Sequence, residues 1–180
     1  MTQYLKTEVQ PLSDLVSSEI VVASTSIATL LGGELISGSD RSSISGRLSI
    51  PEYQRPYRWQ VKHLQRLLLD LTEYFPRSND ATPPKHDFYL GSIILHQSRP
   101  ARKHTDVLSI IDGQQRLITL ALLAHVLKQR DLAKGIELTS PESQSRALYN
   151  LRWLEQQQLP AVDFTRVNIT LVVTRSEDDA

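Results

Sequence analysis

Residues 107–127 read VLSIIDGQQRLITLALLAHVL, and this stretch carries the strongest structural signal in the chain. The apolar run VLSII is typical of a buried strand, and it ends at residue 111. Apolar side chains then cover most of the circumference of a predicted helix that begins after Gly113. Such a helix belongs inside a domain. A polar corner, the DGQQR motif at residues 112–116, therefore lies between two elements that are both expected to be buried.

The polar corner has two physical interpretations. In the first, Asp112 and Gln115 form a capping box, in which the carboxylate accepts the Gln115 N–H and the amide reaches back. In the second, the corner binds an anion, because the first helical turn has unpaired N–H groups and the positive end of the helix dipole. Arg116 opposes that dipole and Gln114 has no capping role, which favours the anion site. Gly113 would allow a close approach to the ligand.

A second polar motif, IPEYQRPYRW, occupies residues 50–59. Its two prolines enforce extended or turn geometry around Tyr53, Gln54 and Arg55. Aromatic rings and guanidinium groups on such a stiff segment can stack a base or bind phosphate. We assign Arg55 to ligand binding because the flanking prolines fix its backbone. For Tyr57 and Trp59 we expect a structural role, with both rings packed on the helix that follows.

Two further segments are predicted to be helical. Apolar side chains recur at helical spacing from Val61 and stop before Pro76, with polar residues on the other face. Another helix is expected from Pro141, after a Ser or Thr cap at residues 139–140. A weaker helical pattern covers residues 11–31, where β-branched residues oppose it.

Strand-like runs occur at residues 47–50, 88–97 and 166–173, in addition to the run that ends at residue 111. We expect the runs at 88–97 and 107–111 to pair as a hairpin with a long basic loop. The loop includes Arg99, Arg102, Lys103 and His104. Contact with a DNA backbone is the functional interpretation of this loop, and a solvated loop is the one we prefer. The mixture of helices and hairpin-like strands indicates an α+β fold.

Composition excludes several classes of protein. The chain has 180 residues and 40% hydrophobic residues, which suffices for one domain with a buried core. Lys+Arg and Asp+Glu number 20 each and the pI is about 7.0, so bulk charge argues for neither nucleic acid nor a membrane as partner. The lack of cysteine excludes disulfides and thiolate chemistry. With neither a spanning apolar run nor a signal peptide pattern, we expect a cytoplasmic protein.

Three pieces of the sequence together resemble one family: IPEYQRPYRW, FYLGSIILH and IIDGQQRLITL, in this order. They are similar to the N-terminal domain of modification-dependent restriction proteins of the GmrSD type, which also occurs in SspE-like defence proteins. The resemblance covers roughly residues 45–130 well. It implies a ParB/sulfiredoxin-like fold, in which helices pack on a small mixed sheet. We expect a helical and loop appendage at residues 1–45 and a nucleotide-binding domain at residues 46–180 that is truncated at its C-terminal end.

The resemblance also implies an activity, namely binding and hydrolysis of a nucleoside triphosphate (NTP) with Mg²⁺, coupled to restriction of modified DNA in phage defence. The positions that match the family's nucleotide motif are Asp112, Gly113, Gln114, Gln115 and Arg116, and those that match the facing segment are Tyr53, Gln54 and Arg55.

The roles that we assign to these positions are hypotheses. Arg116 and the backbone of residues 113–115 would hold phosphates, with Arg55 as a second positive clamp. Asp112 would hold Mg²⁺ or orient a water, and Gln114 or Gln115 would orient phosphate or water.

Three functions remain open at this point. The first is an NTPase module of a DNA restriction system, and the second is a ParB-like module that senses a nucleotide or DNA without hydrolysis. The third is a small nuclease with Asp112 as metal ligand, which we favour least because no second carboxylate or histidine lies at a companion position. The family's His-Asn-His nuclease domain has no counterpart in this chain. The expected partners are therefore modified DNA and a nuclease domain or subunit; no membrane is expected, and the sequence allows an oligomer.

Overall fold

The computed structural model describes residues 18–75, 86–100 and 104–176, and a five-stranded mixed sheet lies at its centre. The strand order is β1-β7-β5-β6-β4. The strands are β1 (Ser18–Ser26), β4 (Arg47–Ser49), β5 (Phe88–Ser98), β6 (Val107–Asp112) and β7 (Val167–Ser176). The pairs β1–β7 and β5–β6 are antiparallel, whereas β5–β7 and β4–β6 are parallel. The hairpin expected from the two apolar runs is therefore confirmed.

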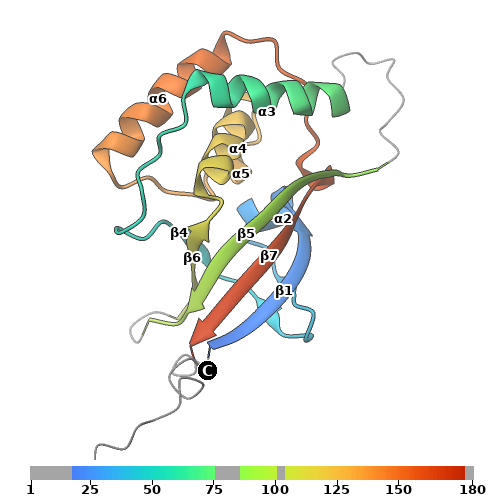
Figure 1. Cartoon of the computed structure of the whole chain (residues 1–180), viewed down its shortest axis with the longest axis vertical. Coiled ribbons are helices and arrows are strands. Elements are labelled where there is room, and N and C mark those ends of the chain that lie inside the picture. The colour runs from blue at the N-terminus through green and yellow to red at the C-terminus, as the bar shows by residue number, and fades with distance from the viewer. Residues whose placement is uncertain (1–17, 76–85, 101–103, 177–180) are drawn as a thin grey trace, which may run out of the picture.

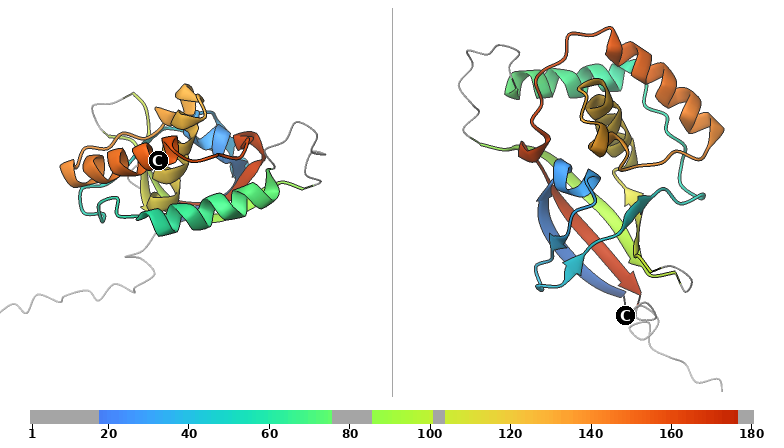
Figure 2. Two further views of the ribbon diagram at one scale, coloured as in Figure 1. Left: turned by 90° about the horizontal axis from the view of Figure 1, so that it is seen from above. Right: turned by 180° about the vertical axis from the view of Figure 1, so that it is seen from behind.

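The helices gather at one end of the sheet, as Figure 1 shows for α3, α4 and α6. Seen from behind, α2 and a small second sheet of β2 and β3 lie over the long strands (Figure 2). The helices are α2 (Ile27–Leu31), α3 (Val61–Tyr74), α4 (Gln114–Val126), α5 (Arg130–Ala133) and α6 (Pro141–Glu155). The remaining elements are β2 (Ile36–Ser37), β3 (Ser43–Ile44) and the 3₁₀ turn η1 (Phe164–Arg166). The expected α+β class, a small mixed sheet packed by helices, is confirmed.

Strand β7 shows why this sequence forms a sheet. Its alternate residues Val167, Ile169, Leu171 and Val173 are all buried, which is the period of two that a half-buried strand requires. Each such side chain contributes about 1.5–3 kcal/mol when it leaves water. They belong to one large core that α3 and α4 complete from the helical end of the molecule.

Helix α4 lies in the interior, as its sequence predicts. Its buried residues point in all directions around the axis: Gln114, Leu117, Ile118, Thr119, Leu120, Ala121, Leu123 and Ala124. The helices expected from Val61 and from Pro141 are also confirmed, and Ser140 caps the latter by accepting the Ser143 N–H.

The helix predicted within residues 11–31 is wrong for residues 18–26, which form β1. Val21 and Ala23 are buried while Ile20 and Val22 are exposed, and this alternation is the signature of a strand. The β-branched residues that oppose helix favour the pleated sheet instead. Strand β1 lies within the segment expected to be an appendage, yet it pairs with β7 along its whole length. Only Ile27–Leu31 is helical here, and residues 11–17 lie outside the described part of the chain.

Across the described residues, no helix has the length and apolar character needed to cross a bilayer.

Candidate functional site

The corner between β6 and α4 is built around a glycine. Strand β6 ends at Asp112, Gly113 is the N-cap with φ 93°, and α4 begins at Gln114. A side chain at residue 113 would be strained in this left-handed conformation, and its Cβ would overlap the Ile93 side chain of β5. Gly113 therefore permits a close approach to the neighbouring strand, and the approach to a ligand stays a prediction.

The capping box, the alternative interpretation of this corner, is absent from the structure. Asp112 Oδ1 accepts the N–H of Gly113 at 2.9 Å, and no side chain caps the first turn of α4. The carboxylate cannot reach the Gln115 N–H because Gly113, not Asp112, occupies the N-cap position. The first turn of α4 thus has no side-chain cap, which leaves its N–H groups available to bind an anion.

The two glutamines of the motif hold the backbone of the segment at residues 55–59. Gln114, which is buried, donates from Nε2 to the Arg55 carbonyl at 2.5 Å. Gln115 Oε1 accepts from the N–H groups of Arg58 at 2.8 Å and Trp59 at 3.1 Å. Gln115 Nε2 donates to the Pro56 carbonyl at 3.2 Å. Both amides are therefore committed to joining the two motifs, which the sequence places more than fifty residues apart.

Arg116 holds β5 against the start of α4. Its guanidinium donates to the carbonyl oxygens of Leu90 at 3.0 Å and Ser92 at 2.9 Å. Between them, Gly91 has φ 125°, and a Cβ there would lie 2.6 Å from Arg116 Nη1. The glycine thus leaves room for the guanidinium, and two of its five donors serve the fold.

Tyr57 anchors the same segment from its other side. The ring is fully buried, and its hydroxyl lies 2.8 Å from Thr119 Oγ1 and accepts from Asn150 Nδ2 at 2.9 Å. Burial raises the pKa of the Tyr57 hydroxyl. The structural role predicted for Tyr57 is confirmed, although its partners come from α4 and α6. Trp59 stacks on His63 of α3 with ring centroids 5.6 Å apart, as predicted.

These contacts create a pocket of about 410 Å³ between the two motifs. It is lined by Gln54, Arg55, Trp59, Ile111, Asp112, Gly113, Gln114, Gln115 and Arg116. All but one of the predicted site residues therefore come together. The exception is Tyr53, which is 78% exposed and does not line the pocket. Trp59 and Ile111 were not assigned to the site. The sequence signal that could have assigned Ile111 to the site is its position directly before the DGQQR motif.

None of the three charged side chains at this pocket has an ion-pair partner among the described residues, and of the three only Arg116 is held by backbone carbonyls. The exposed side chain of Arg55 makes no ion pair or hydrogen bond with any described residue, although its carbonyl is held by Gln114. Asp112 forms no ion pair among the described residues, and the one hydrogen bond of its carboxylate is with the adjacent Gly113 N–H. The pocket thus combines an unpaired cation, an uncapped helix start and an unpaired carboxylate. This combination suits an anion that carries a metal ion.

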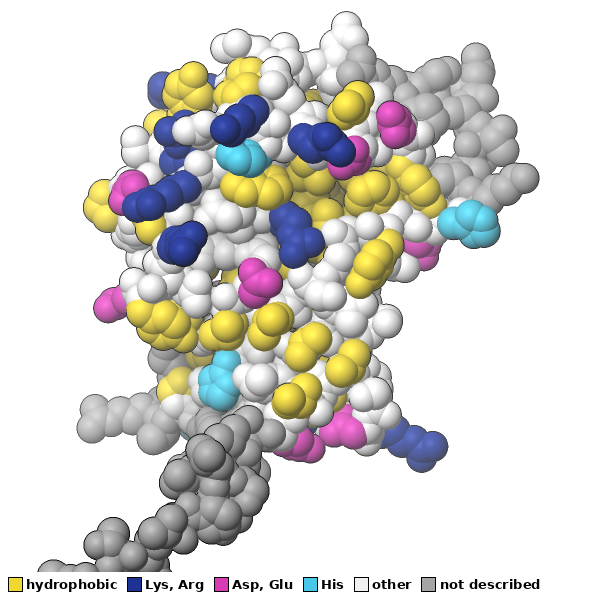
Figure 3. All heavy atoms as spheres, in the orientation of Figure 1, with side chains coloured by type: hydrophobic (Ala, Val, Ile, Leu, Met, Phe, Trp, Pro, Cys, Tyr) yellow, Lys and Arg dark blue, Asp and Glu magenta, His cyan; other side chains and the backbone are white. Residues whose placement is uncertain are grey.

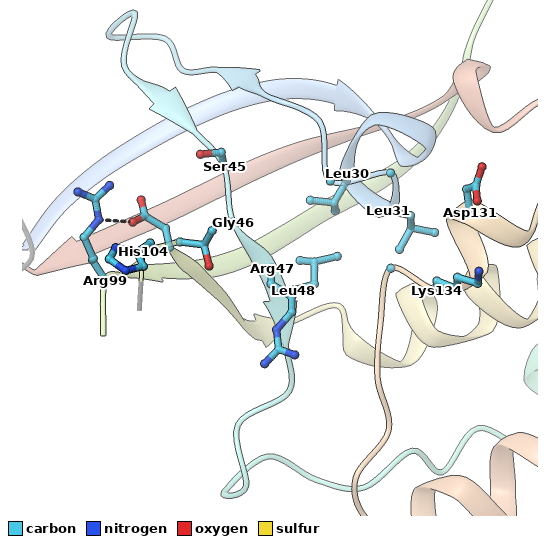
Figure 4. Close-up of a pocket in the computed structure, with 15 residues that line it drawn as sticks. Leu30, Leu31, Ser45, Gly46, Arg47, Leu48, Arg99, His104, Asp131 and Lys134 are labelled. Carbon is cyan, nitrogen blue, oxygen red and sulfur yellow. Dashed lines mark hydrogen bonds and ion pairs between the residues drawn. The ribbon is translucent and has the colours of Figure 1, made fainter. Parts of the chain in front are cut away.

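A second pocket, of about 580 Å³, lies beside β4 and the β5–β6 loop (Figure 4). Its charged groups are spread along the pocket, with Arg99 and His104 at one end, Arg47 in the middle, and Asp131 and Lys134 at the other end. Arg99 is already paired with Asp106 at 2.7 Å. The charges do not converge on one ligand, so this pocket is the weaker candidate. Arg102 and Lys103 of the basic loop lie outside the described residues.

Comparison with known families identifies this architecture. The family model described as "GmrSD restriction endonuclease, N-terminal domain" matches residues 33–176. The match covers most of the chain, so the protein belongs to this family and is a domain of a restriction system. No curated protein matches the sequence.

Proposed function

We propose that this restriction-system domain binds and hydrolyses an NTP in the pocket between the DGQQR corner and the segment at residues 54–59. The observation that carries the proposal is the pairing of an uncapped helix start with an unpaired Arg55 and an unpaired Asp112. The volume of about 410 Å³ falls in the range of small-ligand sites. Modified DNA and a nuclease partner follow as proposed partners from the family of restriction endonucleases.

The phosphates of the nucleotide would lie against the first turn of α4. The N–H groups of residues 114–116 supply hydrogen bonds there, and the helix dipole adds positive potential. Arg55 reaches the same pocket from the facing segment and has all its donors available. Arg116 lines the pocket too, so the N–H donors that it does not use on β5 can also contact the phosphates.

The residues also fit a magnesium ion. Mg²⁺ bound with a nucleotide needs only one or two carboxylates, since phosphates and waters complete its shell. Asp112 supplies one carboxylate oxygen that the Gly113 N–H does not occupy. When bound, the ion would neutralise charge that develops on the phosphates. Asp112 would hold that ion beside the N-terminus of α4. Strand β6 before it and helix α4 after it fix the position of Asp112.

A non-hydrolysing sensor is the second candidate, and one observation favours it. The side chains of Gln114 and Gln115 form hydrogen bonds with backbone groups of residues 55–59. Neither amide is therefore available to orient an attacking water without releasing that segment. Hydrolysis would then fall to Asp112, and a domain that only binds nucleotide remains the natural alternative. A metal-dependent nuclease has less support, because no group of three potential ligands from His, Asp and Glu occurs in the described residues.

The test is direct binding of labelled GTP, ATP, CTP and UTP in the presence of Mg²⁺. Arg55→Ala is the informative variant, because the side chain has no structural partner among the described residues. Arg116→Ala is less suitable, since it also removes two contacts to β5. We expect one or more nucleotides to bind and Arg55→Ala to weaken binding by about 10- to 100-fold.

Asp112→Asn then separates the two candidates. The amide keeps its shape and can still accept the Gly113 N–H, but it removes the charge that would hold Mg²⁺. An NTPase would lose phosphate release in this variant while nucleotide still binds. A wild-type chain that binds nucleotide without releasing phosphate would establish the sensor instead. A folded wild-type chain that binds none of the four nucleotides would refute both.

A further inference from the structure

A third depression lies on the other side of the segment that closes the nucleotide pocket. This groove, of about 700 Å³, runs between residues 57–60 and helix α6. It is lined by Tyr57, Arg58, Gln60, Glu142, Ser145, Arg146 and Tyr149. In the view of Figure 3, Lys and Arg side chains gather over the helical half of the molecule, whereas hydrophobic side chains predominate over the lower sheet. The chain as a whole carries no net charge, so this basic character is local.

The groove has a defined arrangement of charge and ring. The guanidinium carbon of Arg146 lies 5.4 Å from the centre of the Tyr149 ring, in a cation–π contact that leaves its N–H groups free for another ligand. The Tyr149 side chain is 60% exposed. Arg58 on the opposite wall makes one weak ion pair, with Glu142 at 3.4 Å, and both side chains of that pair are mostly exposed. Two guanidinium groups therefore face one open groove beside an exposed aromatic ring.

We propose that the groove between residues 57–60 and α6 binds the sugar–phosphate backbone of DNA, through Arg58 and Arg146 with Tyr149 beside them. Arg presents several donors to a phosphate and stacks on aromatic rings, a combination that is common at nucleic-acid surfaces. The groove is open, and most of the side chains that line it are charged or polar, which suits an extended polyanion better than a small enclosed ligand. The inference rests on the proposed role in a restriction system, but it does not require hydrolysis of a nucleotide.

The groove shares its wall with the nucleotide pocket. Arg58 and Gln60 face the groove, while Arg55 and Trp59 of the same segment line the pocket. Gln115 accepts the N–H groups of both Arg58 and Trp59, so one side chain holds both walls. DNA in the groove would thus contact the element that closes the nucleotide site.

The experiment measures binding of fluorescein-labelled duplex DNA by anisotropy over a series of salt concentrations. We expect Arg58→Ala/Arg146→Ala to bind about tenfold more weakly, with a salt dependence reduced by about two phosphate contacts. Arg130→Ala/Lys134→Ala removes the same charge from exposed positions around α5 and serves as the matched control. It should change neither quantity. Nucleotide affinity and thermal unfolding are measured for every variant, so that misfolding is detected separately.

Glu142→Gln gives a test of opposite sign. The variant releases Arg58 from its carboxylate partner and removes a charge that repels phosphate, so DNA affinity should rise about threefold. A purely structural role for the Arg58–Glu142 pair would give no gain.

Three results would overturn the inference. The first is a wild-type chain that binds nucleotide but not DNA. The second is a loss of DNA affinity in the α5 control equal to that in Arg58→Ala/Arg146→Ala. The third is equally tight binding of polyglutamate at the same residues, which would indicate an acidic protein partner. DNA binding that depends on Arg146 in a chain without nucleotide affinity would support the groove and refute the nucleotide pocket.

Discussion

The two ends of the β5–β6 pair are rich in the same residue types but use them in opposite ways. At the loop end, Arg99 pairs with Asp106 at 2.7 Å, and Gln97 donates to the other Asp106 oxygen at 2.7 Å. The charges there neutralise each other, and hydrogen bonding with Arg99 holds the pKa of Asp106 below its usual value. At the α4 end, neutral amides hold the backbone, and the charged groups are left unpaired.

The difference separates a structural cluster from a candidate site. A charge satisfied by its neighbour has little to offer a ligand. By contrast, Arg55 is held through its carbonyl, which leaves the guanidinium free, and Asp112 keeps one carboxylate oxygen free beside the one that accepts the Gly113 N–H. Gln115 and Gln97 give a matched pair for testing this view, because each makes three hydrogen bonds at its own end.

The largest effect is expected from Gln115→Ala. The change leaves two N–H groups and one carbonyl of residues 56–59 without their partner, which should cost about 2–3 kcal/mol of unfolding free energy. Nucleotide binding should be lost as well, because the segment that carries Arg55 is released. Chemical denaturation and nucleotide binding measure the two effects. Gln97→Ala should lower stability similarly but keep nucleotide affinity. A loss of nucleotide affinity in both variants would contradict the view that only the α4 end supports the nucleotide site.

The next largest effect is expected from Gly113→Ala, which should lower the free energy of unfolding by about 1–3 kcal/mol. The left-handed conformation and the Ile93 contact both oppose a side chain at this corner. Denaturant unfolding is the measurement. Combining the change with Ile93→Val, which relieves part of the overlap, should recover some of the lost stability. A fully stable Gly113→Ala would show that the corner adapts and that the first turn of α4 is not rigidly placed.

Arg55→Ala and Arg99→Ala sharpen the comparison of charges. We expect Arg55→Ala to leave stability within about 0.5 kcal/mol, since its exposed side chain makes no hydrogen bond or ion pair with any described residue, while nucleotide binding weakens. Arg99→Ala should leave nucleotide binding unchanged. Arg99→Ala should also return the Asp106 pKa toward its usual value, which NMR titration of the carboxyl can follow. Equal effects of the two variants on nucleotide affinity would contradict a specific role for Arg55.

The smallest effect concerns Tyr57, whose hydroxyl links α4 and α6. Burial raises its pKa in the folded state above the unfolded value of 10.0. The resulting stability is fully present below that pH and is lost as pH rises through the folded pKa. Unfolding free energy measured from pH about 8 to about 11 should therefore fall more steeply in wild type than in Tyr57→Phe. Parallel curves would show that the hydroxyl ionises as easily in the folded chain as in the unfolded one.

The sequence by itself determined much of this protein. Apolar runs located β5, β6 and β7, apolar side chains at helical spacing located α3 and α4, and the cap with Pro141 located α6, because these signals are local to each element. The sequence also singled out the two polar motifs, because polar groups between buried elements need partners. The same reasoning failed at β1, where nine residues without a clear period took their structure from pairing with β7.

Only the tertiary structure decided what each polar side chain does. Gln114 and Gln115 were assigned to phosphate or water, but in the fold they hold a segment that the sequence places far away. Asp112 was a possible cap, but the left-handed Gly113 took that position. The hydrogen-bond partners of a side chain depend on which segments lie next to it. For segments that are distant in the sequence, the tertiary fold decides this. Residue types are local, whereas the pairing that leaves Arg55 and Asp112 free is set by the whole fold.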